Sequence, residues 1–173
     1  MMRWRLFFLT FGLSSGLALA QVPTTAPLPS ANRTSLTLKF NGQPVAVDTA
    51  FSRLEVSTGV NKVLSLNLVR TDSPDDQGLT ILIDRFPLTT GEYRFKEILS
   101  GQVRDASYRQ GTTTAYSNAC GLNDGVVQVL ALDTQRHLIR GTYRAVLCEA
   151  EARAGKRRRF TVEGTFQGRY FIQ

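Results

Sequence analysis

The stretches Ile139-Arg-Gly-Thr-Tyr143 and Phe160-Thr-Val-Glu-Gly-Thr-Phe166, near the C-terminus, decide the fold. In both, apolar residues and glycines alternate with polar residues. Because successive side chains of a β-strand point to opposite faces, this period of two predicts two half-buried strands. The alternation after Phe160 continues to Ile172, which we expect on the buried face. The segment 152–155 between the strands suits a hairpin loop, so we expect an antiparallel pair.

The loop also predicts the register of this hairpin. Gly141 then lies opposite Phe166, and Gly164 lies opposite Tyr143. An aromatic ring over a cross-strand glycine covers backbone that would otherwise be exposed to water. We therefore interpret the two Gly-Thr-aromatic triplets as packing devices rather than as a ligand motif.

Charged residues follow Leu147 at positions that would continue the buried face. The same register places Glu149 opposite Arg158 and Glu151 opposite Lys156. We therefore expect the tip of the hairpin to project beyond the core into water.

These two stretches and further short motifs support a likeness to a known family. They are the segments 125–133, 139–143 and 160–166, with Phe40-Asn-Gly-Gln43 and Gly91-Glu-Tyr93 upstream. Together they resemble a family of small exported bacterial β-proteins, often lipoproteins, with Gly-Thr-aromatic closing strands. The family is a domain of unknown function, so the resemblance implies a fold and no catalytic residue.

Residues 1–20 have the features of a secretory signal peptide. Arg3 and Arg5 are followed by an apolar segment and by a small-residue cleavage site at 18–20. The apolar segment is too short and interrupted for a transmembrane span, and no cysteine near the cut offers a lipid anchor. We expect export to the periplasm or beyond, after cleavage near Ala20-Gln21.

The expected mature chain combines a leader with one domain. Proline-rich residues 21–34 predict a flexible leader, and residues 35–173 are long enough for a single all-β domain. Without Arg3 and Arg5 the chain holds 19 basic and 14 acidic side chains, a formal charge of +5. This charge is moderately basic, and an outward-facing protein can carry it for solubility alone.

Cys120 and Cys148 are the only cysteines of the chain. In an exported protein two such residues are expected to form a disulfide. A turn near 133–137 would bring them within a few residues of one another. Closing this loop should stabilise the fold by about 3–4 kcal/mol.

The rest of the chain contains short alternating segments and no sustained helical period. Asn41-Gly42 is the strongest hairpin signal, Leu64, Leu66 and Leu68 should face the core, and the run 79–86 should be buried on both faces. Segment 51–57 fits a strand or a helical turn, and the inner face of 126–132 is open between odd and even positions. About nine to eleven strands indicate an all-β fold, either an antiparallel calycin-like meander barrel or a two-sheet sandwich.

The hairpin tip holds the most prominent group of candidate site residues. Arg153, Lys156, Arg157 and Arg159 could bind an anion or ligand such as a phosphate of a headgroup or an acidic polysaccharide. The alternative is a solvated tip that protects a sheet edge. No aromatic residue is interleaved with these cations, which argues against sequence-specific nucleic-acid binding.

Signals for catalysis are weak. His137 is the only histidine and lies in an expected turn, and Asp72, Asp75 and Asp76 share a loop without the spacing of a calcium site. No cofactor or metal motif is present in the sequence.

Three functions follow from these patterns. The first is a non-catalytic exported β-domain that binds a small apolar molecule, a glycan or an envelope component. The second is a structural or interaction protein that docks to an anionic surface through the basic tip. A hydrolase with a hidden site is the third. An interior ligand would require a gap beside Gly141, Ala145, Gly164 and Gly168.

Overall fold

The computed structural model describes residues 34–72, 77–95, 103–151 and 157–173. These residues form one mixed sheet of 13 strands, and the short 3-10 turn η2 (Asn118–Cys120) is their only helical element. The strands are β1 (Ser35–Leu36), β2 (Leu38–Phe40), β3 (Gln43–Val45), β4 (Val47–Val56), β5 (Val63–Arg70), β6 (Gly78–Asp84), β7 (Gly91–Arg94), β8 (Arg104–Gln110), β9 (Thr113–Tyr116), β10 (Gly125–Asp133), β11 (Leu138–Glu149), β12 (Arg159–Arg169) and β13 (Phe171–Ile172).

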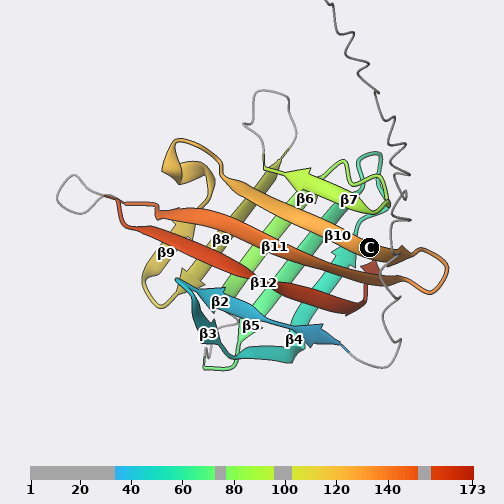
Figure 1. The fold of residues 1–173 in the computed structure, drawn as a ribbon, viewed down its shortest axis with the longest axis horizontal. Helices are drawn as coiled ribbons and strands as arrows, with labels where there is room; N and C mark the ends of the chain where they lie inside the picture. Colours follow the sequence, from blue (N-terminus) through green and yellow to red (C-terminus); the bar gives the residue numbers. More distant parts are fainter. Residues whose placement is uncertain (1–33, 73–76, 96–102, 152–156) are drawn as a thin grey trace, which may run out of the picture.

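The sheet runs in the order β13-β4-β5-β6-β8-β9-β11-β12-β2-β3, with β10 beside β11, β7 beside β10 and β1 beside β12. It folds over on itself, so that a front layer of β2, β12, β11, β10 and β7 crosses a back layer of β4, β5, β6 and β8 (Figure 1). Buried side chains of both layers form one core. In the part of the chain that is described, no helix is long and apolar enough to cross a membrane.

The all-β prediction is confirmed, with two differences in detail. The structure shows one open sheet, and β13 pairs parallel with β4, where an antiparallel barrel or two sheets was expected. It has 13 strands because single residues, Thr37, Ala46 and Tyr170, interrupt what the sequence predicts as continuous segments.

The predicted register of the C-terminal hairpin is confirmed. Gly141 pairs with Phe166 and Gly164 with Tyr143. A Cβ added to Gly141 would meet the Phe166 ring at 2.4 Å and the Gln128 carbonyl at 2.3 Å, so only glycine fits beneath the ring. The Tyr143 hydroxyl donates to the Thr37 carbonyl at 2.7 Å, and burial raises the pKa of this phenol.

The structure decides two alternatives that the sequence left open and confirms two local predictions. Segment 51–57 is largely strand, in β4, and the odd positions Val127, Val129 and Ala131 of β10 face the core. The buried Leu64, Leu66 and Leu68 are confirmed. The Asn41-Gly42 turn is also confirmed, with positive φ at both residues as a tight two-residue hairpin requires.

Two expectations about burial are wrong. β6 alternates between buried and half-buried residues, because its outer face is open to solvent. Ile172 is 50% exposed, since the chain leaves the β12 ladder at Tyr170 and pairs with the edge of β4 instead.

Candidate binding surface at the disulfide corner

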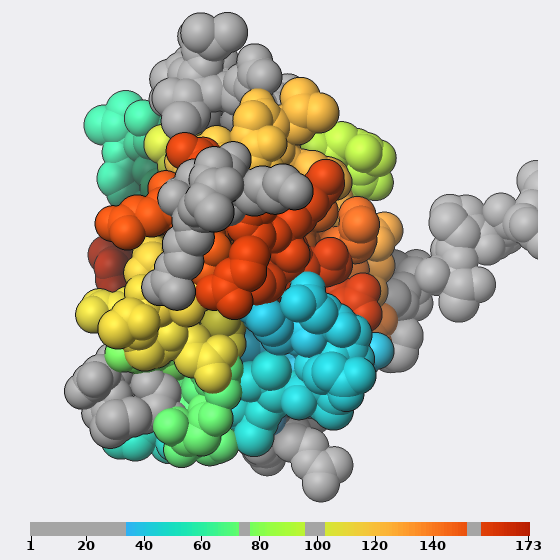
Figure 2. Space-filling model, turned by 90° about the vertical axis from the view of Figure 1, so that its left-hand side faces the viewer, coloured from blue at the N-terminus to red at the C-terminus, as the bar shows by residue number. Residues whose placement is uncertain are grey.

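The back layer continues into the front layer through a narrow seam between β9 and β11. Only two residue pairs join these strands, Cys148 with Tyr116 and Glu149 with Ala115. Figure 2 looks onto this end of the molecule, where β9 (yellow) lies beside the ends of β11 and β12 (orange-red) and to the left of the β2–β3 hairpin (cyan).

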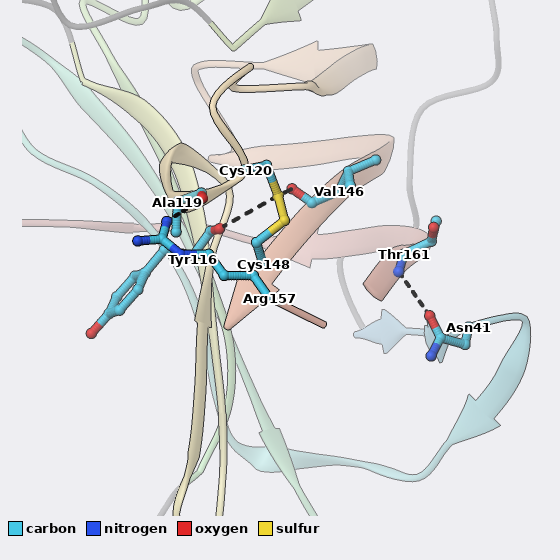
Figure 3. The surroundings of a disulfide bond; sticks show 8 residues. All are labelled: Asn41, Tyr116, Ala119, Cys120, Val146, Cys148, Arg157 and Thr161. Atoms are coloured by element: carbon cyan, nitrogen blue, oxygen red, sulfur yellow. Dashed lines mark hydrogen bonds between the residues drawn. A yellow bond between two sulfur atoms is a disulfide. The ribbon is translucent and has the colours of Figure 1, made fainter. Parts of the chain in front are cut away.

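The predicted disulfide lies at this seam. Cys120, the last residue of η2, is bonded to Cys148 of β11, with Cα atoms 5.0 Å apart (Figure 3). The bond therefore attaches the turn after β9 directly to β11, at the residue that pairs with Tyr116. It reinforces one of the short ladders of the sheet, with two residue pairs like those of β1 with β12, β12 with β2 and β13 with β4.

The basic residues of the hairpin differ in their contacts. Arg157 donates from Nη1 to the carbonyl of Ala119 in η2 at 2.5 Å (Figure 3), so this guanidinium helps to fix the disulfide corner. Arg159 is exposed and lies opposite Cys148. Arg153 and Lys156 lie outside the described residues, as do the loop 152–155 and the expected pairing of Glu151 with Lys156.

The predicted pair of Glu149 and Arg158 is confirmed, but its setting differs from the expectation. Arg158 Nε donates to Glu149 Oε1 at 2.9 Å, and this carboxylate raises the pKa of Arg158. Glu149 is only 6% exposed because β9 packs beside it, so at this position the hairpin does not project into water.

A surface depression of about 250 Å³ borders the seam. It is lined by Thr112, Thr113, Thr114, Tyr116, Glu149, Ala150 and Glu151. The Tyr116 side chain is 39% exposed and points away from the disulfide (Figure 3). Hydroxyl and carboxylate groups thus surround one accessible aromatic ring.

A second depression, of about 220 Å³, lies on the outer face of the back layer and shares Thr114 and Tyr116 with the first. Its polar lining includes Asn67, Gln77, Thr80, Ser107 and Arg109. Cross-strand pairing aligns these groups, because Asn67 pairs with Thr80, Thr80 with Ser107 and Ser107 with Tyr116. We call the two depressions together the Tyr116 trough.

A hydrogen-bond network holds Tyr108, which lines the second depression of the trough. Tyr108, whose ring is buried, accepts a hydrogen bond from Arg70 and donates to Gln110 Oε1 at 3.1 Å. Arg70 also holds Asp72, with 2.8 Å between Nε and Oδ1. This contact raises the pKa of Arg70 and lowers that of Asp72. Asp72 is therefore engaged by a cation, while Asp75 and Asp76 fall outside the described residues.

The other candidates do not form a site. His137 lies in a turn as predicted, with its ring packed against Tyr170. The interior gap required by an enclosed ligand is not found beside Gly141 and Gly164, because aromatic rings and backbone oxygens occupy that space. Among the described residues, no group of three or more His, Cys, Asp or Glu could hold a metal.

Tyr116 and its polar neighbours were not predicted from the sequence. One local signal was present: in β9, Ala115 faces the core while Tyr116 shares the outer face with Thr114. A single exposed aromatic residue is common on protein surfaces, so this local signal alone does not identify a binding surface. The partners contributed by β5, β6 and β8 depend on long-range pairing, which no local pattern reveals.

Comparisons with protein-family models, with curated proteins and with solved structures found no match to this chain. The chemistry of the trough is therefore the guide to function. It offers one accessible aromatic face, several hydroxyls, two amides, two carboxylates and one cation along a single surface.

Proposed function

We propose that this protein is an exported, non-catalytic β-domain that binds a glycan of the cell envelope in the Tyr116 trough. The observation that carries the proposal is the exposed Tyr116 ring between two polar depressions. A sugar ring presents an apolar face of C–H groups, which packs on an aromatic ring, and a rim of hydroxyls. The hydroxyls would pair with side chains such as Asn67, Ser107 and Arg109, which can donate hydrogen bonds.

Export is part of the same proposal. It is supported by the signal-like residues 1–20 and by the Cys120–Cys148 disulfide, a bond that persists in oxidising compartments. We also propose membership in the family of small exported β-proteins that the closing strands resemble. For the fold type we propose an open, flattened barrel over a two-sheet sandwich, because β13 continues β12 and pairs with β4.

The other functions have less support. A small apolar ligand would need an interior gap, and rings fill the space beside Gly141 and Gly164. Docking through the hairpin tip is weakened because Arg157 and Arg158 are already engaged by Ala119 and Glu149. A glycosidase needs a carboxyl that can donate a proton, whereas Glu149 is committed to Arg158.

The test is a glycan array followed by calorimetry with the best-binding oligosaccharide. Tyr116→Ala should weaken binding about tenfold or more, since it removes the stacking face. Tyr116→Phe should bind within a few-fold of the parent, because the ring is kept. Leu122→Ala, which removes an exposed apolar side chain outside the trough, is the matched control.

The proposal fails if no glycan binds the parent protein at millimolar concentration. It also fails if Tyr116→Ala binds as tightly as the parent and the control. Release of reducing sugar from the bound glycan would replace the binding function with hydrolysis.

A further inference from the structure

The outer face of the front layer carries basic side chains in one cross-strand row. Arg94 pairs with Val126, Val126 with Arg144, Arg144 with Glu163 and Glu163 with Lys39. The row therefore crosses β7, β10, β11, β12 and β2, which lie side by side in Figure 1. We call Arg94, Arg144 and Lys39 the cationic row.

The spacing of the cationic row is regular. Two strand spacings separate Arg94 from Arg144, and two more separate Arg144 from Lys39. Neighbouring strands lie about 4.8 Å apart, so a positive charge recurs about every 10 Å at right angles to the strands. A linear ligand with regularly repeated negative charges would match this arrangement.

The three cations of the row differ in whether they already form an ion pair. Arg94 is bridged to Glu92 at 2.5 Å and Lys39 to Glu163 at 3.7 Å. Exposed Arg144, by contrast, has no hydrogen bond or ion pair with any described residue. Four residues along the same strand, Arg140 has a buried Nε without a hydrogen-bond partner in the described chain. Two arginines on the outer face of β11 thus lack an acceptor among the described residues.

A depression of about 290 Å³ lies at the same place. It is lined by Thr37, Lys39, Thr142, Tyr143, Arg144, Glu163, Gly164 and Thr165. Thr142 pairs across the strands with Thr165, whose hydroxyl is 2.9 Å from that of Thr37. A row of threonines thus runs beside the row of cations, so the surface offers hydroxyl groups next to positive charge.

We propose that this face binds a linear acidic polysaccharide, lying across the strands with carboxylates at Arg144 and Lys39 and sugar hydroxyls at the threonines. An anionic membrane is a poorer fit, because none of the large exposed hydrophobic side chains of the described chain lies on β2, β7, β10, β11 or β12 to anchor in lipid. A nucleic acid is a poorer fit as well, since the row offers no aromatic ring on which bases could stack. A single small anion would leave most of the row unused.

Glu163 gives the proposal a sharp test, because it is the one acidic side chain between two cations of the row. The probe is polygalacturonate, measured by calorimetry at low salt against the same polymer with its carboxylates reduced. Arg144→Gln should weaken binding about tenfold, as loss of a charge-assisted contact implies. Glu163→Gln should strengthen it several-fold, since a repulsive charge is removed and Lys39 is released.

Lys62→Gln serves as the control. It removes one exposed positive charge just before β5 of the back layer and should leave binding within twofold. A gain of affinity in Glu163→Gln cannot arise from misfolding, so the test does not depend on Arg144→Gln alone.

The expected result is binding to the acidic polymer that weakens with salt and is lost with the reduced polymer. Equal binding to both polymers, or no effect of Arg144→Gln and Glu163→Gln, would overturn the proposal. Tighter binding to phosphatidylglycerol vesicles or to single-stranded DNA would overturn it in favour of those partners.

Discussion

The β11–β12 hairpin and the β9–β11 seam hold the same strand on its two sides in different ways. On one side, eleven residue pairs run from Leu138–Arg169 to Cys148–Arg159. On the other, β9 contributes two pairs, with a disulfide and a buried carboxylate beside them. The hairpin is local in sequence and extensive, whereas the seam joins the two layers and is short. The disulfide thus lies on the side of β11 where its neighbour β9 contributes only two backbone pairs, whereas the ion pair of Glu149 with Arg158 lies on the hairpin side.

The largest expected effect comes from removing the covalent contact of the seam. Cys120→Ala with Cys148→Ala should lower the free energy of unfolding by about 3–4 kcal/mol, as expected for a closed loop of this length. Urea unfolding monitored by circular dichroism measures the loss. Hydrogen exchange should rise in β9 and η2 well before it rises in β11 and β12, because the hairpin keeps its own ladder.

Equal hydrogen-exchange rates in all strands of this double variant would contradict the expected difference between the seam and the hairpin. It would mean that the seam and the hairpin open as one unit. The parent protein in a reducing agent provides the control, because it breaks the same bond without changing a side chain.

A smaller effect is expected from a single methyl group within the hairpin. Gly141→Ala places a Cβ against the Gln128 carbonyl and the Phe166 ring, which should cost about 2–3 kcal/mol through overpacking. Gly59→Ala is the matched control, since a Cβ there meets no atom within 4 Å and should be nearly neutral. Urea midpoints of the two variants compare them directly.

Equal midpoints for Gly141→Ala and Gly59→Ala would show that the ring over Gly141 shifts aside at little cost. The hairpin would then be held by its backbone ladder alone, and the Gly-Thr-aromatic triplets would need another explanation.

The same contrast explains what the sequence could predict. The hairpin follows from alternation and from glycines opposite aromatic residues, both of which are local, so its register was predicted correctly. The disulfide followed from the presence of two cysteines in a chain whose first residues resemble a signal peptide. Neither prediction required knowledge of how the layers cross.

Features that depend on pairing between distant strands were either not predicted or predicted wrongly. Glu149 is buried because β9 lies beside it, and Ile172 is exposed because β13 pairs parallel with β4. The Tyr116 trough combines side chains of β5, β6, β8, β9 and β11, so no single segment carries its pattern. The cationic row likewise becomes visible only when five strands are in register.

The smallest expected effect comes from comparing a carboxylate of the hairpin with one of β8, the strand that pairs with β9. Glu163 in the hairpin is bridged to Lys39, whereas Asp105 in β8 is half-buried, has no ion-pair partner among the described residues, and has its pKa raised by burial. The native state therefore holds the Asp105 proton more tightly than the unfolded chain does. Stability should fall as the pH rises from the ordinary aspartate pKa through the raised one.

Asp105→Asn should remove this loss, because the amide carries no charge to desolvate. The variant should be slightly more stable than the parent at pH 7, by well under about 1 kcal/mol because solvent screens this half-exposed group, and should match the parent near pH 3. Urea midpoints at the two pH values give the difference, and Glu163→Gln, which loses the contact with Lys39, should not be stabilised at pH 7. A less stable Asp105→Asn at pH 7 would contradict this prediction. It would mean that the Asp105 carboxylate stabilises the back layer, as the Glu163 carboxylate stabilises the hairpin.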